Sequence, residues 1–62
     1  METKFKYIEI IKIEGREVVK RIDVSYQSER NIDKIQLGIL RNMDTDNYTV
    51  CSISSKVKLE II

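Results

Sequence analysis

Apolar and polar residues alternate with a period of two along residues 4–26, which is the pattern of β-strands. Apolar side chains occupy odd positions in the first half of this stretch and even positions in the second half. They are Phe5, Tyr7, Ile11 and Ile13, followed by Val18, Ile22, Val24 and Tyr26. Glu14-Gly15 lies between the halves, and glycine accepts the positive φ of a tight turn. The pattern therefore predicts a β-hairpin.

Two positions of the turn are possible, and they differ in the residue pairs that they create. A turn at Glu14-Gly15 places residues opposite each other whose numbers sum to 29. The pairs are Glu9 with Lys20, Lys12 with Glu17, Lys6 with Asp23, Ile10 with Val19, Phe5 with Val24, Tyr7 with Ile22, and Ile11 with Val18. A turn at Gly15-Arg16 keeps the two faces but loses the opposite-charge pairs. Because each cross-strand pair contributes about 0.2–1 kcal/mol, we predict the first register.

The apolar spacing lengthens after Ser28 and predicts a helix over residues 29–43. Ser28 is a good N-cap, and Glu29 places a negative charge in the first turn. The apolar stripe consists of Ile32, Ile35, Ile39, Leu40 and Met43, and Gln36 interrupts it. Gly38 in the helix interior costs about 1 kcal/mol relative to alanine. It is either a tolerated weakness or a point where the backbone lies close to the sheet or to a partner chain.

The turn residues 44–47 end the helix, and residues 48–53 alternate again as a strand. Residues 56–62 form a second alternation, with Val57, Leu59 and Ile61 on one side. Because Ser54-Ser55 is a weak turn signal, this tail is a hairpin partner, the continuation of one bent strand, or a strand given to another protomer. The order ββαβ(β) predicts one α+β domain over residues 1–62. It consists of an antiparallel sheet with one helix packed on one face.

Composition excludes several kinds of chemistry. The chain has no histidine, which is the most common general base and metal ligand. Cys51, the single cysteine, forms neither an internal disulfide nor a cysteine-based zinc site, and its alternating surroundings predict a buried small hydrophobe. The two glycines are isolated, so the sequence has no glycine-rich phosphate loop. We therefore predict that the protein is not an enzyme and uses no metal or cofactor.

Asp44, Asp46 and Asn47 suggest the start of a calcium-binding loop. An EF-hand loop needs an oxygen ligand at its fifth position, glycine at its sixth and glutamate at its twelfth. Tyr48, Thr49 and Ser55 stand at those positions. The match fails, and the cluster is typical of a turn that ends a helix.

The N-terminus has no apolar stretch of the kind found in signal peptides, and the longest apolar runs are pairs. We expect a cytoplasmic protein without a membrane span. The chain has 11 Lys and Arg against 10 Asp and Glu, for a net charge of +1. This charge provides no strong field for nucleic acid or an anionic membrane.

The second face of the hairpin carries Ile8, Ile10 and Val19 between charged residues that include Arg21. One helix covers only one face of a small sheet, and an apolar centre with a charged rim is typical of an interface. A chain of 62 residues also buries only about 60% of its unfolded surface, so its core is small. We interpret Ile8, Ile10, Val19 and Arg21 as a candidate protein interface and predict a homodimer. Scattered exposed aliphatic residues are the alternative.

Arg30, Lys34, Leu37 and Arg41 fall within about 60° of each other on a helical wheel, opposite the apolar stripe. This basic strip is a candidate surface for phosphates or for an acidic partner. A solvated helix face is the competing interpretation, because the net charge is small and no aromatic residue lies among the bases.

The stretches Glu17–Val24 and Ser28–Tyr48 resemble a group of short uncharacterised proteins encoded by phages and prophages of Gram-positive bacteria. The shared pattern is EVVxRIDVxxxSERxxxKIxxGMxxNLNHDxYxT, which covers about residues 17–49. The chain departs from it at residues 43–46, where Met-Asp-Thr-Asp stands in place of Leu-Asn-His-Asp. The group has no established activity.

The resemblance implies a small accessory protein that acts on a host or phage protein, with interference in a host process as the expected class. The residues favour a non-enzymatic module that binds another macromolecule. The alternatives are a nucleic-acid-binding module that uses the basic strip and a small structural component of a phage.

Overall fold

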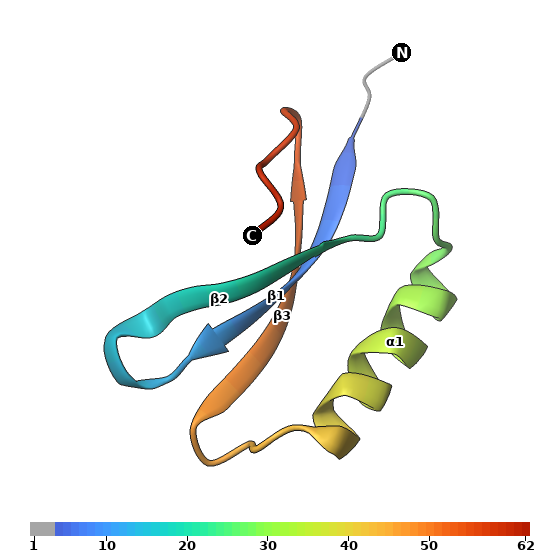
Figure 1. Cartoon of the computed structure of the whole chain (residues 1–62). Coiled ribbons are helices and arrows are strands. Elements are labelled where there is room, and N and C mark those ends of the chain that lie inside the picture. The colour runs from blue at the N-terminus through green and yellow to red at the C-terminus, as the bar shows by residue number, and fades with distance from the viewer. Residues whose placement is uncertain (1–3) are drawn as a thin grey trace.

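Figure 1 shows the computed structural model, which describes residues 4–62. Its elements are β1 (Phe5–Lys12), the short 3₁₀ turn η1 (Glu14–Arg16), β2 (Glu17–Asp23), α1 (Glu29–Asn42) and β3 (Tyr48–Ser55). The strands form one antiparallel sheet in the order β2-β1-β3, so β1 lies at the centre. The predicted α+β fold, with an antiparallel sheet and one helix, is confirmed.

The hairpin of β1 and β2 follows the predicted register only next to its turn. Lys12 pairs with Glu17 and Ile11 pairs with Val18, as predicted. A β-bulge between Ile10 and Ile11 then shifts the pairing by one residue. The observed pairs beyond the bulge are Ile10 with Lys20, Glu9 with Arg21, Ile8 with Ile22, and Tyr7 with Asp23. The predicted pairs beyond the bulge are therefore wrong, and Val19 is the extra residue with no partner across the hairpin.

The bulge also decides which face of the sheet the helix covers. A shift of one residue moves the side chains of a strand to the other face relative to its partner. Here it places Ile22 and Val24 of the second half of the hairpin on the same face as Ile8. These residues form the core together with α1, and the face with Tyr7 and Glu9 lies on the other side. The sequence pattern had suggested the reverse assignment of the two faces.

α1 begins where the sequence predicts and ends one residue earlier, at Asn42. The Ser28 hydroxyl accepts a hydrogen bond of 3.2 Å from the backbone N–H of Asn31, which is the geometry of an N-cap. The apolar stripe faces the sheet. The buried core residues are Ile8, Val24, Ile32 and Val50, and Ile10, Ile22, Ile35, Ile39, Leu40 and Met43 pack against them.

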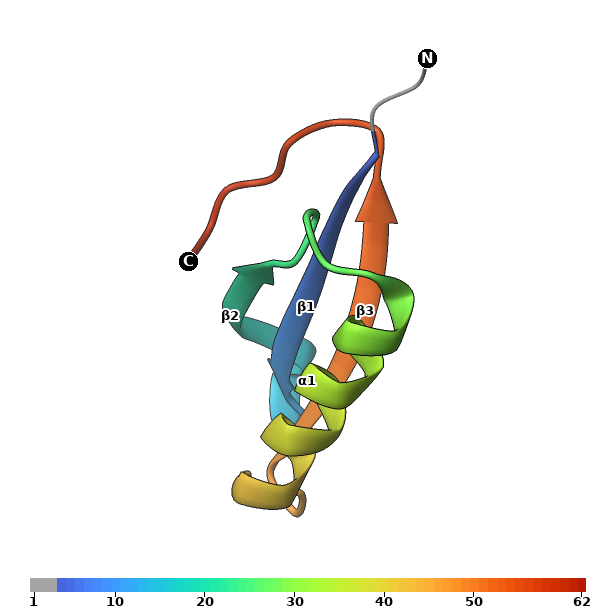
Figure 2. The same cartoon turned by 90° about the vertical axis from the view of Figure 1, so that its right-hand side faces the viewer.

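Residues 56–62, called here the C-terminal segment, form no strand. They turn back after β3 and cross the face of the sheet opposite α1, as Figures 1 and 2 show. The Tyr7 hydroxyl accepts a hydrogen bond of 3.0 Å from the backbone N–H of Leu59. A guanidinium nitrogen of Arg21 donates to the carbonyl oxygen of Glu60 at 2.7 Å. Within one chain, the segment is therefore neither a hairpin partner of β3 nor its straight continuation.

Candidate functional site

The four residues predicted as a protein interface do not form one surface. Ile8 is fully buried in the core beneath α1, so it is not accessible to a partner. Ile10 is partly buried on the same side, whereas Arg21 lies on the opposite face beside Glu9. Val19 keeps 40% of its surface exposed. The four residues therefore do not share one exposed face, because the bulge places the helix over the side of the hairpin that was expected to be open.

The structure instead leaves an open groove beside the helix. Figure 2 shows α1 in front of β1 and β3, while β2 lies to one side. The groove between α1 and the hairpin has a volume of about 860 Å³. Its wall and floor include Ile10, Val19, Ile35, Gly38, Ile39 and Met43, and its polar border includes Lys20, Asn42, Asp44 and Tyr48. We call this feature the α1–hairpin groove.

Gly38 lies in the helical wall of this groove, and within residues 4–62 the space beside its Cα, where a side chain would stand, is open. A Cβ atom built at Gly38 meets no heavy atom within 4 Å. The chain's own sheet therefore does not require a glycine at this position. A close approach by a partner and a tolerated weakness of the helix are the two explanations that remain.

The face opposite α1 holds a shielded ion pair that the sequence reasoning missed. The guanidinium of Arg21 contacts the Oε2 atom of Glu9 through Nε at 2.8 Å and through Nη2 at 2.7 Å. Their side chains retain only 18% and 10% of their exposure, and the adjacent Tyr7 is fully buried. The signal in the sequence was Glu9 itself, a carboxylate between Tyr7 and Ile11 on an otherwise apolar side of the strand.

The surroundings of Cys51 disfavour its thiolate form. Burial raises the pKa of the Cys51 thiol, and the negative charge of Glu9 raises it further. The thiol is therefore held in its protonated form, which is a poor nucleophile.

At the end of β2, Ser25 holds the pKa of Asp23 below its usual value. The larger cause is a hydrogen bond with the Ser25 side chain, and the smaller is a hydrogen bond with the Ser25 backbone.

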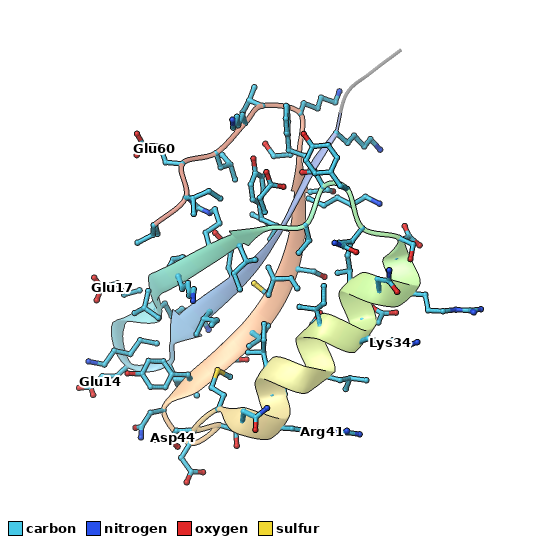
Figure 3. All side chains as sticks on the ribbon, turned by 45° about the vertical axis from the view of Figure 1, so that its right-hand side comes forward. Glu14, Glu17, Lys34, Arg41, Asp44 and Glu60 are labelled. Carbon is cyan, nitrogen blue, oxygen red and sulfur yellow. The ribbon has the colours of Figure 1, made fainter. Side chains whose placement is uncertain are left out.

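The basic strip occupies the outer face of α1. Arg30, Lys34, Leu37 and Arg41 are all exposed, and Leu37 retains 54% of its surface. Figure 3 shows Lys34 and Arg41 pointing away from the sheet. The strip therefore lies outside the α1–hairpin groove, on a separate surface of the same helix.

The acidic residues after α1 form a turn. The Asp44 carboxylate accepts hydrogen bonds from the backbone N–H of Asp46 at 3.1 Å and from the Asn47 side-chain amide at 2.6 Å. Across residues 4–62, no group of three or more His, Cys, Asp and Glu side chains lies close enough together to hold a metal ion.

The same residues include no helix with the length and apolar character needed to cross a bilayer.

Comparisons with protein-family models, with curated proteins and with solved structures found no match to this chain.

Proposed function

We propose that this protein is a non-enzymatic module that binds a partner protein through the α1–hairpin groove, and that the occupant of the groove is a helix of the partner. The carrying observation is the open groove, whose helical wall contains a glycine that the chain's own packing does not require.

The position of the open region and its lining support a helix as the occupant. α1 lies over β1 and β3 (Figure 2), so the part of the sheet next to β2 is left uncovered. Apolar side chains line this part, as they do in grooves that accept amphipathic helices. Gly38 lets the backbone of the occupant approach α1 closely.

The resemblance to phage and prophage proteins suggests the setting: an accessory protein that acts in the cytoplasm on a host or phage protein.

Two matched substitutions test the groove. Val19→Asp places a charge in the groove, and Leu37→Asp places one on the outer face of α1; both wild-type side chains are exposed. Tagged wild-type and variant proteins are used to capture partners from nuclease-treated host lysate. We expect a protein that the wild type and Leu37→Asp retain and that Val19→Asp loses. Equal capture by both variants would contradict a role for the groove.

Nucleic-acid binding is the second candidate, and the exposed basic strip is the observation that favours it. Arg30, Lys34 and Arg41 make no ion pair within residues 4–62, so their charges are available to phosphates. Binding through this strip weakens steeply as salt is raised. The double variant Arg30→Glu, Lys34→Glu then abolishes binding to a fluorescent DNA or RNA oligonucleotide. Unchanged binding by that variant would exclude the strip.

A further inference from the structure

The two edges of the sheet differ in how they are protected against pairing with another strand. β2 carries a bulge and the charged residues Glu17, Lys20, Arg21 and Asp23, which are features that natural proteins use to block edge pairing. β3 has none of these features. Its sequence from Tyr48 to Ser55 contains no charged residue and no proline, and it pairs with β1 in an unbroken register. The β3 edge is therefore open to another strand.

The peptide groups that β3 offers at this edge follow from its pairing with β1. The backbone N–H of Ile13 donates to the carbonyl oxygen of Asn47 at 2.9 Å. Because hydrogen-bonded positions alternate along an antiparallel pair, the odd residues of β3 bond to β1. The even residues Val50, Ser52 and Ser54 direct their N–H and C=O groups outward, whereas the N–H of Tyr48 donates to the carbonyl oxygen of Asp44 at 3.0 Å. Among residues 4–62, no strand pairs with that edge.

The same chain contains a segment that has the pattern of a strand and no strand partner. In the C-terminal segment, Val57, Leu59 and Ile61 alternate with charged residues. Val57 retains 64% of its exposure, Ile61 54% and Ile62 61%. The backbone of the segment is held to the sheet by the hydrogen bonds of Leu59 and Glu60 described above. Most of its apolar surface is therefore unused in its position across the sheet.

We propose that two copies of the chain exchange their C-terminal segments, each segment adding as a strand to the β3 edge of the other copy. Exchange of an identical element between protomers is a low-cost route to a dimer. In an antiparallel pair with two-fold symmetry that spans residues 50–60, the numbers of the paired residues sum to 110. Ser54 then lies opposite residue 56 of the partner copy, and Ser52 lies opposite residue 58. This arrangement uses the outward peptide groups of Val50, Ser52 and Ser54.

Side-chain chemistry fits this register on both faces. Side chains alternate without a break from β3 into the segment, so the partner's Val57, Leu59 and Ile61 join the face of Ile53, Cys51 and Thr49. On the other face, the partner's Lys56 and Lys58 stand beside Ser54 and Ser52. The acidic residues Glu29 and Asp33 of α1 line the same pocket as these serines, so opposite charges meet.

The register also keeps the two helices apart. Each helix lies over its own β3, and the two-fold axis passes through Ser55. The helices are therefore displaced by about eight residues along the strands, or roughly 26 Å at 3.3 Å per residue. The exchange does not use the α1–hairpin groove, so either proposal is able to fail without the other.

Cross-linking tests the register directly. Cys51 lies opposite residue 59 of the other copy in a non-hydrogen-bonded pair, where Cα atoms are about 4.5 Å apart and a disulfide fits. The Leu59→Cys variant is prepared with ¹⁴N and with ¹⁵N, and the two preparations are mixed and oxidised. The expected product is a dimer in which Cys51 of one copy is linked to position 59 of the other. In the control Lys58→Cys, the new thiol lies on the other face and no such dimer forms. A link within one chain, or equal dimer yield from the control, would overturn the proposal.

Edge blocking tests the dimer in the full chain without a new cysteine. Ser52→Pro removes an N–H that points outward and leaves the ladder with β1 intact, whereas Ser52→Thr keeps the N–H. By sedimentation equilibrium, the wild type and Ser52→Thr are expected to dimerise, and Ser52→Pro is expected to raise the dissociation constant about tenfold or more. Far-UV circular dichroism checks that the proline variant is folded, and Ser54→Pro replaces it if it is not. A strictly monomeric wild type, or an equally tight dimer from a folded proline variant, would overturn the proposal.

Discussion

Replacing Gly38 with alanine separates the stability of the helix from the use of the groove. The new methyl group meets no heavy atom within 4 Å, so the folded chain accommodates it without strain. Alanine is about 0.8–1 kcal/mol more favourable than glycine inside a helix. The free energy of unfolding is therefore expected to rise by about 1 kcal/mol, with an increase in Tm of about 4–8 °C for a domain of this size. Urea unfolding followed by far-UV circular dichroism measures the change.

The same methyl group stands in the wall of the α1–hairpin groove. If a partner helix packs closely there, the substitution overpacks the contact by about 1–3 kcal/mol, which weakens the Kd roughly 5- to 150-fold. Titration calorimetry with the captured partner measures this effect. Lys34→Ala, on the outer face of α1, is the control and is expected to change stability by less than about 0.5 kcal/mol. A more stable Gly38→Ala variant with unchanged affinity would refute the close approach and leave Gly38 as a tolerated weakness.

Three further predictions concern the folded chain. Arg21→Met leaves the carboxylate of Glu9 shielded from solvent and without its counter-charge. The free energy of unfolding, measured with urea, is therefore expected to fall by about 3–5 kcal/mol. Adding Glu9→Gln to this variant is expected to restore part of the loss. Ser28→Ala removes the helix cap and is expected to cost about 1 kcal/mol in the same assay, whereas Ser28→Asp retains the cap. The pKa of Asp23 is lowered in the folded chain. The ionised carboxylate of Asp23 therefore stabilises the fold at pH values above its unfolded pKa of about 3.9. This contribution is lost as the pH falls through the lower pKa of the folded state. In unfolding curves recorded from pH 7 to pH 2, Asp23→Asn is expected to show a smaller loss of stability below pH 4; an unchanged profile would contradict this role.

Local signals in the sequence were sufficient for the helix. Ser28, Glu29 and the apolar spacing specify where α1 begins and which of its sides faces the sheet, because these features act within a few residues of each other. The three strands and the turns between them are also local features. These elements are enough to predict the α+β fold from the order of the segments alone.

The pairing of the strands was less predictable. The charge pairs of the regular hairpin, such as Glu9 with Lys20, compete with an alternative in which one bulge brings Arg21 opposite Glu9. The second arrangement also places Ile22 on the face of Ile8, and its benefit depends on α1 and β3, which are distant in sequence. A pattern read along one strand does not contain that information. This is why the predicted interface included Ile8, which is in the core.

The candidate surfaces also differ in whether they depend on one element or on several. The basic strip was visible in the sequence because all of its members lie on one helix. The α1–hairpin groove was not, because Val19 and Gly38 come from different elements and meet only in the folded chain. Only Gly38 gave a sequence signal, as a residue that weakens the helix in which it lies.

The position of β1 has a consequence for how the protein forms as it is synthesised. β1 is the first of the three strands of the sheet to leave the ribosome, yet it is the central strand and pairs on one side with β3, the last of the three. The hairpin is able to close early, because its loop is short, whereas the pairing of β1 with β3 must close a much longer loop. Until α1 and β3 emerge, the nascent hairpin presents Ile8 and Ile10 to its surroundings. Docking of β3 is therefore expected to be the slow step, and the growing chain is most vulnerable to aggregation just before it.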